Sequence, residues 1–327
     1  MTYRQTLFVT LVLSILAAQP AAAAQQAAKV PRVGFLYPGP TAVATTRIAA
    51  FLEGLRGMGY VQGQHFTLES RMAEGKPERM PALAAELVRL PVDVMLAASP
   101  VAIQAARSAT TAIPIVALDL ETDPIASGLI ASFARPGGNI TGIFFDFPDF
   151  SGKWLELLKE AVPRLSRVAV FWDPATGPVQ LKAAEAAAKA LGLQLQTLEV
   201  RAATDFEQAL RSATQGRAGG LLLLSSPVFG GNLKLVADLA VRNRLPAITL
   251  FPEFADAGGL MAYGSNLHDL FRQSGVLVAK VLRGAKPAEL PAERPTRFEL
   301  VVNLKTARAL GLTLPPSVMV RATQVIE

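Results

Sequence analysis

Few residues of this chain have the type and spacing that catalysis needs. It contains two histidines, His65 and His268, and no cysteine. A metal site needs several ligands that converge, and these two histidines open separate predicted elements, a strand and a late helix. The chain also lacks a GxSxG nucleophile elbow and a GxxxxGK[ST] phosphate loop. We therefore expect no enzymatic activity, no catalytic residues, no bound metal and no cofactor.

Residues suited to binding follow the ends of predicted strands. In open α/β sheets, ligands bind beyond the carboxyl ends of the strands, where loops lead into helices. The residues predicted to contact a ligand on this basis are Tyr37, Ser99, Pro100, Thr122, Asp123, Trp172, Asp173, Ser225, Ser226, Phe251 and Tyr263. The pattern predicts a binding cleft.

Ser99 is the most informative of these residues. It is expected to cap a helix that begins with Pro100, the residue type favoured at the first helical position. The free amides of Val101 and Ala102 would then form a seat for a carboxylate. The alternative is that Ser99 only caps its helix. Ser225 and Ser226 repeat the same pattern later in the chain.

Aromatic and acidic side chains at the same strand ends indicate the kind of ligand. Tyr37, Trp172 and Tyr263 could form walls for a flat apolar molecule, and Phe251 could equally belong to the core. Either Asp123 or Asp173 could hold an ammonium group, or each could stabilise its own turn.

The elements that must position these residues alternate regularly. We expect strands at 32–37, 65–70, 92–97, 113–118, 167–172, 193–200, 219–224, 247–251, 260–263 and 298–303. Helices are expected at 47–58, 80–90, 101–110, 179–191, 205–214, 234–244, 267–283 and 304–310. This alternation is typical of right-handed βαβ units, so we predict α/β architecture with parallel sheets.

The pattern occurs twice. VDVMLAASP at 92–100 matches GGLLLLSSP at 219–227, and each is followed by a helix and a further strand. We therefore predict two Rossmann-like lobes, at 30–142 and 143–266, with a central ligand cleft. The helix near 267–284 is expected to return to the first lobe and residues 296–327 to the second. Gly137 and Gly138, between the halves, are the predicted hinge.

The first 24 residues are typical of a cleavable signal peptide. Arg4 precedes an apolar run from Leu7 to Ala18, and Ala22-Ala23-Ala24 follows. About a dozen apolar residues are too few to span a bilayer, although a retained N-terminal anchor is the alternative. With no cysteine after the run, a lipid anchor is excluded. We expect a periplasmic protein.

Composition supports a globular protein that does not bind nucleic acid. Of its residues, 51% are hydrophobic and 18% charged. One of the 32 Lys and Arg residues is Arg4, so 31 face 26 Asp and Glu in the mature chain, a net charge of +5. These charges are scattered, whereas nucleic-acid binding requires a basic stripe. About 300 residues form ample cores without disulfides, and we expect a monomer.

Several segments resemble a known family. RPGGNITG (135–142), TDPIASGL (122–129), AGGLMAYG (257–264), LRGAKPAELP (282–291) and FELVVNLKTARALGLTLPPS (298–317) are similar to the ABC-transporter substrate-binding family that includes tryptophan- and tyrosine-binding proteins. The resemblance runs from Val33 to the end. It implies the type I periplasmic-binding architecture, closure around a ligand, and a permease of the inner membrane as partner. It also suggests an aromatic amino acid or a related carboxylate as the ligand.

The sequence departs from the family in two places. Relatives commonly carry Ala-Thr-Pro where this chain has Ser99-Pro100, which keeps a hydroxyl. They commonly carry Asn-Pro where it has Trp172-Asp173-Pro174, which alters the far wall of the cleft. A solute-binding protein of an ABC importer is the function we predict, and a ligand-sensing module that presents its ligand to a membrane receptor is the alternative.

Overall fold

The computed structural model describes residues 30–145 and 147–327. The predicted signal peptide at 1–24 lies outside the described residues. No helix in the described ranges is long and apolar enough to cross a membrane.

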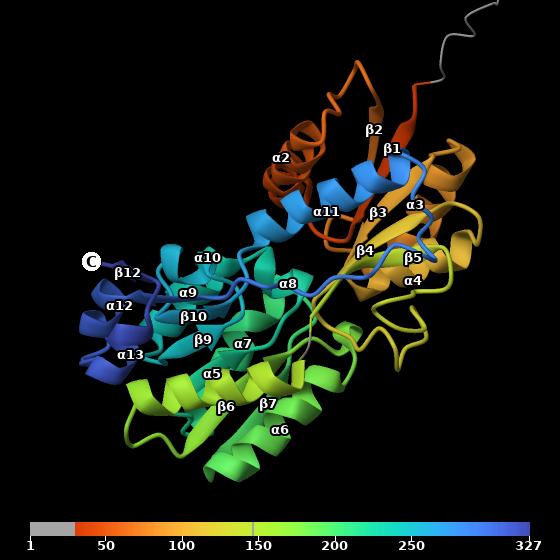
Figure 1. Ribbon diagram of the computed structural model, residues 1–327. Coiled ribbons are helices and arrows are strands. Elements are labelled where there is room, and N and C mark those ends of the chain that lie inside the picture. The colour runs from red at the N-terminus through yellow and green to blue at the C-terminus, as the bar shows by residue number, and fades with distance from the viewer. Residues whose placement is uncertain (1–29, 146) are drawn as a thin grey trace, which may run out of the picture. The chain divides into compact units, whose positions relative to one another are not determined.

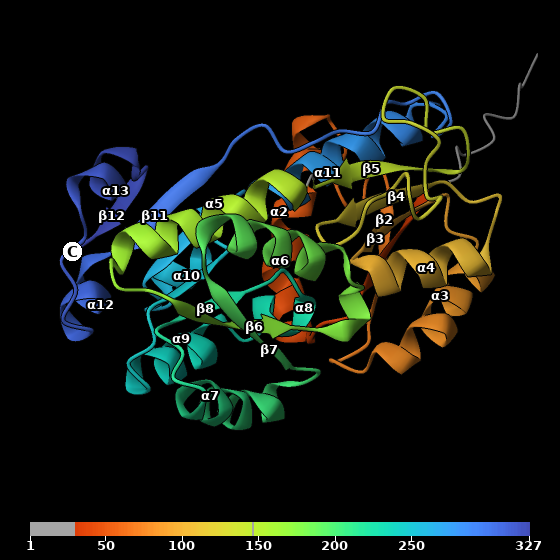
Figure 2. The ribbon, with the colours of Figure 1, turned by 90° about the horizontal axis from the view of Figure 1, so that it is seen from below.

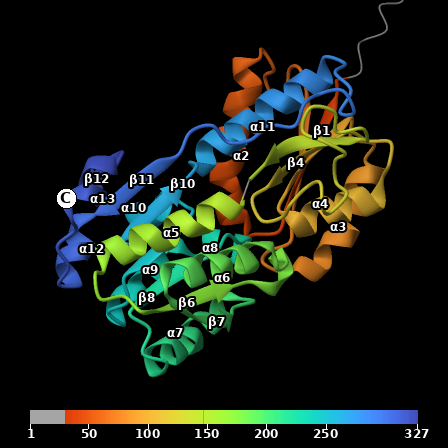
Figure 3. The same ribbon diagram turned by 60° about the horizontal axis from the view of Figure 1, so that its bottom comes forward.

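The first lobe is built on a five-stranded parallel sheet in the order β2-β1-β3-β4-β5. Its strands are β1 (Arg32–Tyr37), β2 (Thr67–Met72), β3 (Val94–Ala98), β4 (Ile115–Asp119) and β5 (Ile140–Phe144). Helices α2 (Thr41–Gly57) and α11 (Leu267–Leu282) cover one face, and α3 (Met80–Arg89) and α4 (Pro100–Ala109) cover the other (Figures 1 and 3). The short 3₁₀ helix η1 (Pro77–Arg79) leads into α3. Because both faces are covered, β1, β3, β4 and β5 are apolar and buried along nearly their whole length.

The second lobe is built on a seven-stranded sheet in the order β12-β11-β10-β9-β8-β6-β7. Its strands are β6 (Arg167–Trp172), β7 (Gln194–Glu199), β8 (Gly220–Leu223), β9 (Ala247–Thr249), β10 (Met261–Gly264), β11 (Glu299–Asn303) and β12 (Gln324–Ile326). All neighbours are parallel except β10 and β11, which pair antiparallel. The prediction of two α/β lobes with parallel sheets is confirmed, with β11 as the exception.

Helices cover both faces of this second sheet as well. They are α5 (Phe147–Ala161), α6 (Val179–Leu191), α7 (Phe206–Gln215), α8 (Pro227–Gly230), α9 (Leu233–Arg242), α10 (Glu253–Asp256), α12 (Leu304–Ala309) and α13 (Pro316–Arg321), with 3₁₀ turns η2 (Pro174–Thr176) and η3 (Ala203–Asp205). Figure 2 shows α5 and α6 side by side on one face, with α7 and α9 on the opposite face. Phe171, Phe206 and Phe229 form an aromatic core beneath α7 and α9.

Helix α11 belongs late in the sequence but packs across α2 of the first lobe (Figure 1). Two glycines allow this contact. A Cβ atom on Gly54 would lie 1.9 Å from the Arg272 carbonyl oxygen, and one on Gly275 would lie 2.2 Å from the Phe51 carbonyl oxygen. Because any side chain at either position would separate the helices, both positions require glycine.

The chain passes between the two sheets after β5, after β10 and before β11. These passages lie against one another. The Phe145 ring is 6.0 Å from that of Phe298, and the Ser265 hydroxyl donates a hydrogen bond of 3.0 Å to the Arg297 carbonyl oxygen. The three passages therefore form one bundle of chain segments that cross between the lobes, called the crossing strands below.

The predicted hinge residues lie before this bundle. Gly137 has a positive φ of 85° in the loop preceding β5, and its N–H donates to the Ala288 carbonyl oxygen at 3.1 Å. Ala288 belongs to the segment between α11 and β11. This segment also pairs with β5 through Glu293, whose N–H donates to the Gly142 carbonyl oxygen at 2.8 Å. Gly137 and Gly138 thus stand one strand earlier than the passage into the second sheet, and a hinge role for them stays a prediction.

Candidate ligand-binding site

A pocket lies where the carboxyl ends of the two sheets face each other. It is lined from the first lobe by Tyr37, Arg47, Ala98, Ser99, Leu118, Leu120 and Glu121, from the second by Ser226, Pro227, Gly230 and Phe251, and from α11 by Leu267 and Phe271. The pocket has a volume of about 40 Å³, room for a few water molecules. A wider groove of about 520 Å³ adjoins it and shares Ser99 and Pro227.

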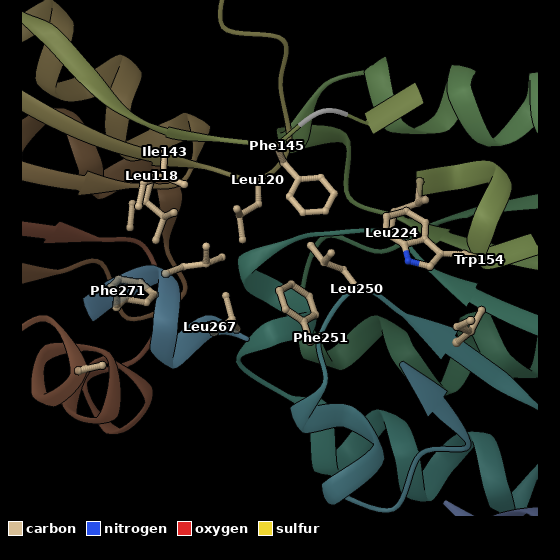
Figure 4. Close-up of a cluster of buried hydrophobic side chains, with 14 of the residues drawn as sticks. Leu118, Leu120, Ile143, Phe145, Trp154, Leu224, Leu250, Phe251, Leu267 and Phe271 are labelled. Atoms are coloured by element: carbon tan, nitrogen blue, oxygen red, sulfur yellow. The ribbon is translucent and has the colours of Figure 1, made fainter. Parts of the chain in front are cut away.

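The walls of the pocket are mostly apolar and come from both lobes. Figure 4 shows Leu118, Leu120 and Phe271 gathered with Leu250 and Phe251 in one buried cluster. Phe271 stacks on Phe35 with ring centroids 6.1 Å apart, which fixes the aromatic wall to the first sheet. An apolar lining with a few polar groups is typical of a small-molecule site.

Two polar groups of the first lobe stand at this wall. Tyr37 is buried, and burial raises the pKa of its hydroxyl, with the nearby Arg47 guanidinium acting in the opposite direction. The Arg47 side chain is 11% exposed and its guanidinium carbon lies 5.9 Å from the centre of the Phe271 ring. The pocket therefore holds a positive charge in apolar surroundings.

Ser99 has an unusual backbone conformation. Its φ is 96° and its ψ is 156°, a region that only glycine adopts without strain. Its hydroxyl oxygen accepts from the Ala102 N–H at 3.5 Å, a long contact that leaves much of its hydrogen-bonding capacity open. Ser99 does cap α4, and the residue lines the pocket. Strain of this kind is found at sites of function.

Glu121 connects the lobes. Its carboxyl oxygen Oε1 accepts a hydrogen bond of 2.7 Å from the Ser225 hydroxyl of the second lobe, and Oε2 accepts from the Leu120 N–H at 3.2 Å. Burial, with the nearby Asp119 and then Asp173 carboxyls adding to it, raises the pKa of Glu121 to about 8. Burial likewise raises the pKa of Asp119, whose Oδ1 accepts from the N–H groups of both Glu121 and Thr122. Burial therefore favours the protonated, uncharged form of the Glu121 carboxyl.

Ser225 and Ser226 are both buried and both engaged. The Ser226 hydroxyl donates to Asp173 Oδ2 at 2.6 Å and accepts from the Val228 N–H at 3.0 Å. Gln180 brackets Ser225, because its side chain accepts from the Ser225 N–H at 2.7 Å and donates to the Ser225 carbonyl oxygen at 2.9 Å. Burial raises the pKa of Asp173.

The structure thus places four of the predicted contacts at the pocket: Tyr37, Ser99, Ser226 and Phe251. Pro100 and Asp173 line the adjoining groove. Ser225 faces the first lobe through Glu121.

The other predicted contacts lie elsewhere. Thr122 lines a surface hollow beside α4, and Asp123 is exposed and caps its own turn through the N–H groups of Ile125 and Ala126. The Trp172 indole N–H donates to the Gly177 carbonyl oxygen at 3.0 Å. The Tyr263 ring stacks on Phe150, 5.9 Å between centroids, beside the crossing strands.

Sequence reasoning missed Arg47, Glu121 and the apolar residues Leu118, Leu120, Leu267 and Phe271. Glu121 directly precedes the predicted contact Thr122, and the sequence alone does not distinguish a buried acid from an exposed one there. Arg47 was expected to open a helix, whereas α2 begins six residues earlier at Thr41. The short apolar run Ala42 to Ala44 before it was the available signal. Among the described residues no group of His, Cys, Asp and Glu could hold a metal ion.

Comparisons with known proteins identify a family and relatives to which this chain is similar. Residues 42–326 match the sequence family described as ABC transporter substrate binding protein. A tyrosine-binding protein of Clostridioides difficile is 25% identical over 264 residues, which cover 80% of this chain and 75% of that protein.

Two solved structures share the fold. A conserved domain protein from Vibrio cholerae superposes with a TM-score of 0.83 at 24% identity, covering 91% of this chain and all of that one. An ABC domain from Streptococcus pneumonia in complex with L-Trp superposes with a TM-score of 0.82 at 24% identity, covering 90% of this chain and 99% of the other. The architecture is that of type I periplasmic binding proteins.

Proposed function

Because this chain belongs to the family of ABC transporter substrate-binding proteins, we propose that it captures an aromatic amino acid or a related aromatic carboxylate for an importer. Proteins of this family bind their substrates without transforming them, so the chain is not an enzyme. The observation that carries the proposal is the pocket between the lobes, with aromatic walls, one guanidinium and one carboxyl. A flat apolar ligand with a charged head group matches that lining.

Ligand entry on this proposal requires the lobes to separate. A cavity of about 40 Å³ cannot admit an aromatic ring, and contacts such as that of Ser225 with Glu121 must open first. Closure then buries the ligand between the two sheets. The tyrosine named for the relative from Clostridioides difficile and the L-Trp of the streptococcal complex are compatible with this ligand class.

The partner on this proposal is the permease of an ABC importer, and the working compartment is the periplasm. The segment at 1–24 supports export, since it has the order of charge, apolar run and small residues of a signal peptide. N-terminal sequencing of the exported protein should give a start near Gln25, and a chain that still begins with Met1 would rule out cleavage.

The ligand class is tested by thermal unfolding of the purified protein with a panel of L-tyrosine, L-tryptophan, L-phenylalanine, L-leucine, L-lysine and D-ribose. A ligand at about 100 times its dissociation constant adds roughly 2.7 kcal/mol to the free energy of unfolding. We expect aromatic amino acids to raise the melting temperature and lysine and ribose to leave it unchanged. A shift with ribose alone would refute the proposed ligand class.

A further inference from the structure

Among residues 30–145 and 147–327, Arg47 is the one cationic side chain that lines the pocket described above. It lies on α2, and its side chain is 11% exposed. Removing a guanidinium from water is costly unless it is paired and hydrogen-bonded. What Arg47 contacts therefore indicates what it is for.

The ion pair that Arg47 makes in this structure is long. Its Nη1 lies 3.5 Å from Oε1 of Glu253, which belongs to α10 of the second lobe. A charge-assisted hydrogen bond is normally 2.7–2.9 Å long, and a guanidinium can make two in parallel with one carboxylate. The Arg47–Glu253 pair makes no such fork.

Glu253 is equally incomplete. Its Oε2 atom is buried and has no hydrogen-bond partner. Burial raises the pKa of Glu253, which favours the neutral form, while the Arg47 charge acts in the opposite direction. A neutral Glu253 would leave the guanidinium without a counter-charge.

The remaining neighbours of Arg47 are an aromatic face and a phenol. Phe271 lies under its guanidinium carbon at 5.9 Å, and Tyr37, whose hydroxyl pKa the Arg47 charge lowers, lines the same wall. Neither supplies a negative charge at neutral pH. Both orient the planar guanidinium at the pocket wall, as an aromatic face does for arginine.

We propose that Arg47 reads the carboxylate of the ligand, and that Glu253 is its counter-ion only while the pocket holds no ligand. This rests on the ligand class proposed above and names the residue that selects it. A structural role would look different, because an Arg47–Glu253 pair that only held the closed lobes together would need both partners equally.

The test is a cycle of two probes and three variants. L-tyrosine carries the carboxylate, and tyramine is the same molecule without it. Isothermal titration measures the dissociation constant of each probe with the parent, Arg47→Gln, Arg47→Lys and Glu253→Gln proteins, and thermal unfolding checks that each variant is folded.

We expect the parent to bind tyrosine at least about tenfold more tightly than tyramine. Arg47→Gln should weaken tyrosine binding at least about thirtyfold, since it removes a desolvated charge partner, and should change tyramine binding little. Arg47→Lys should fall between, because it keeps the charge and loses the planar fork. Glu253→Gln should leave tyrosine binding unchanged or tighter.

Other outcomes overturn the inference in different ways. If the parent binds tyrosine but Arg47→Gln weakens both probes equally, Arg47 is a lobe fastener and the inference fails alone. If Arg47→Gln and Glu253→Gln weaken tyrosine equally, the pair acts as a unit and the inference fails again. If the parent binds neither tyrosine nor any other aromatic carboxylate, the proposed ligand class fails and the inference falls with it. Should Arg47→Gln not fold, a parent that does not distinguish tyrosine from tyramine still overturns it.

Discussion

Two Ser-Pro turns occupy equivalent places in the two lobes and behave differently. Ser99-Pro100 follows β3 and opens the ten-residue helix α4, while Ser226-Pro227 follows β8 and opens the four-residue α8. Each serine caps its helix and each proline stands at the first turn. Ser226 has extended backbone, with φ of −163°, whereas Ser99 has φ of 96°.

Their hydroxyls differ as much as their backbones. The Ser226 hydroxyl donates to Asp173 at 2.6 Å and accepts from the Val228 N–H at 3.0 Å, both within its own lobe. The Ser99 hydroxyl has a single long contact of 3.5 Å. The two turns therefore differ: the Ser226 hydroxyl is tied to two partners of its own lobe, whereas the Ser99 hydroxyl keeps hydrogen-bonding capacity open, at a cost of about 1–3 kcal/mol in backbone strain.

The largest effect we predict concerns the contact that joins the two lobes, between Glu121 and Ser225. In the closed form the pKa of Glu121 is about 8, because burial and the Asp119 and Asp173 carboxyls oppose its ionisation. In an open form, with Glu121 in water, the pKa should return toward its usual value near 4.5. Closing then takes up a proton between these two pH values.

A pKa raised in the closed form means that closure is most favourable below about pH 4.5, weakens as the pH rises, and levels off above about pH 8. We expect the affinity for 3-(4-hydroxyphenyl)propionate, a probe without an amine, to fall between pH 6 and pH 8 by up to about tenfold per pH unit. Titration calorimetry of the parent measures this.

Glu121→Gln is the matched variant, since the amide keeps an acceptor for Ser225 and does not titrate. Its affinity should be flat over the same pH range. Glu74→Gln is the control, because Glu74 is an exposed carboxylate whose pKa is lowered by hydrogen bonds from Thr41. An equal pH dependence in the parent and in Glu121→Gln would show that another group controls closure.

The second prediction tests whether the Ser226 turn is rigid. Asp173→Ala leaves the Ser226 hydroxyl proton and the Ala175 N–H without acceptors in a buried site. We expect a loss of about 2–3 kcal/mol in the free energy of unfolding, measured by urea denaturation. Asp123→Ala removes a similar pair of turn contacts at an exposed site and should cost no more than about 1 kcal/mol. Equal losses in the two variants would contradict a rigid second turn.

Much of this contrast follows from the sequence and some of it does not. Alternating apolar runs and helices predict parallel sheets, so the strand ends that carry Tyr37, Ser99, Ser226 and Phe251 were predicted to meet. The recurrence of Ser-Pro predicts both caps. Backbone strain at Ser99 leaves no trace in residue type, because only the packed neighbours determine it.

The site residues that sequence reasoning missed or misplaced depend on tertiary packing. Arg47 lies within α2, which begins at Thr41. Its N-cap residue, Pro40, makes no side-chain cap hydrogen bond, so the sequence carries no capping signal for the true start of the helix. Phe271 reaches it because α11 returns across α2 over two glycines, a contact between distant parts of the chain. Trp172 ends a strand as expected, yet its indole N–H donates a hydrogen bond to the Gly177 carbonyl oxygen. Direction of a side chain at a strand end is set by such local bonds.

The smallest effect we predict separates the cap, the strain and the ligand contact of Ser99. Ser99→Gly relieves the strain of the positive φ, and glycine caps nearly as well as serine. We therefore expect it to be as stable as the parent or more stable. Ser99→Ala keeps the strain and loses the cap, which costs up to about 1 kcal/mol.

Both variants lose the hydroxyl, so if that group contacts the ligand both should bind L-tyrosine roughly tenfold more weakly, a loss of about 1–2 kcal/mol. Calorimetry beside thermal unfolding keeps the two effects apart. If both variants bind as tightly as the parent, Ser99 is a cap alone, the strained turn serves the fold, and the two Ser-Pro turns differ in backbone but not in function.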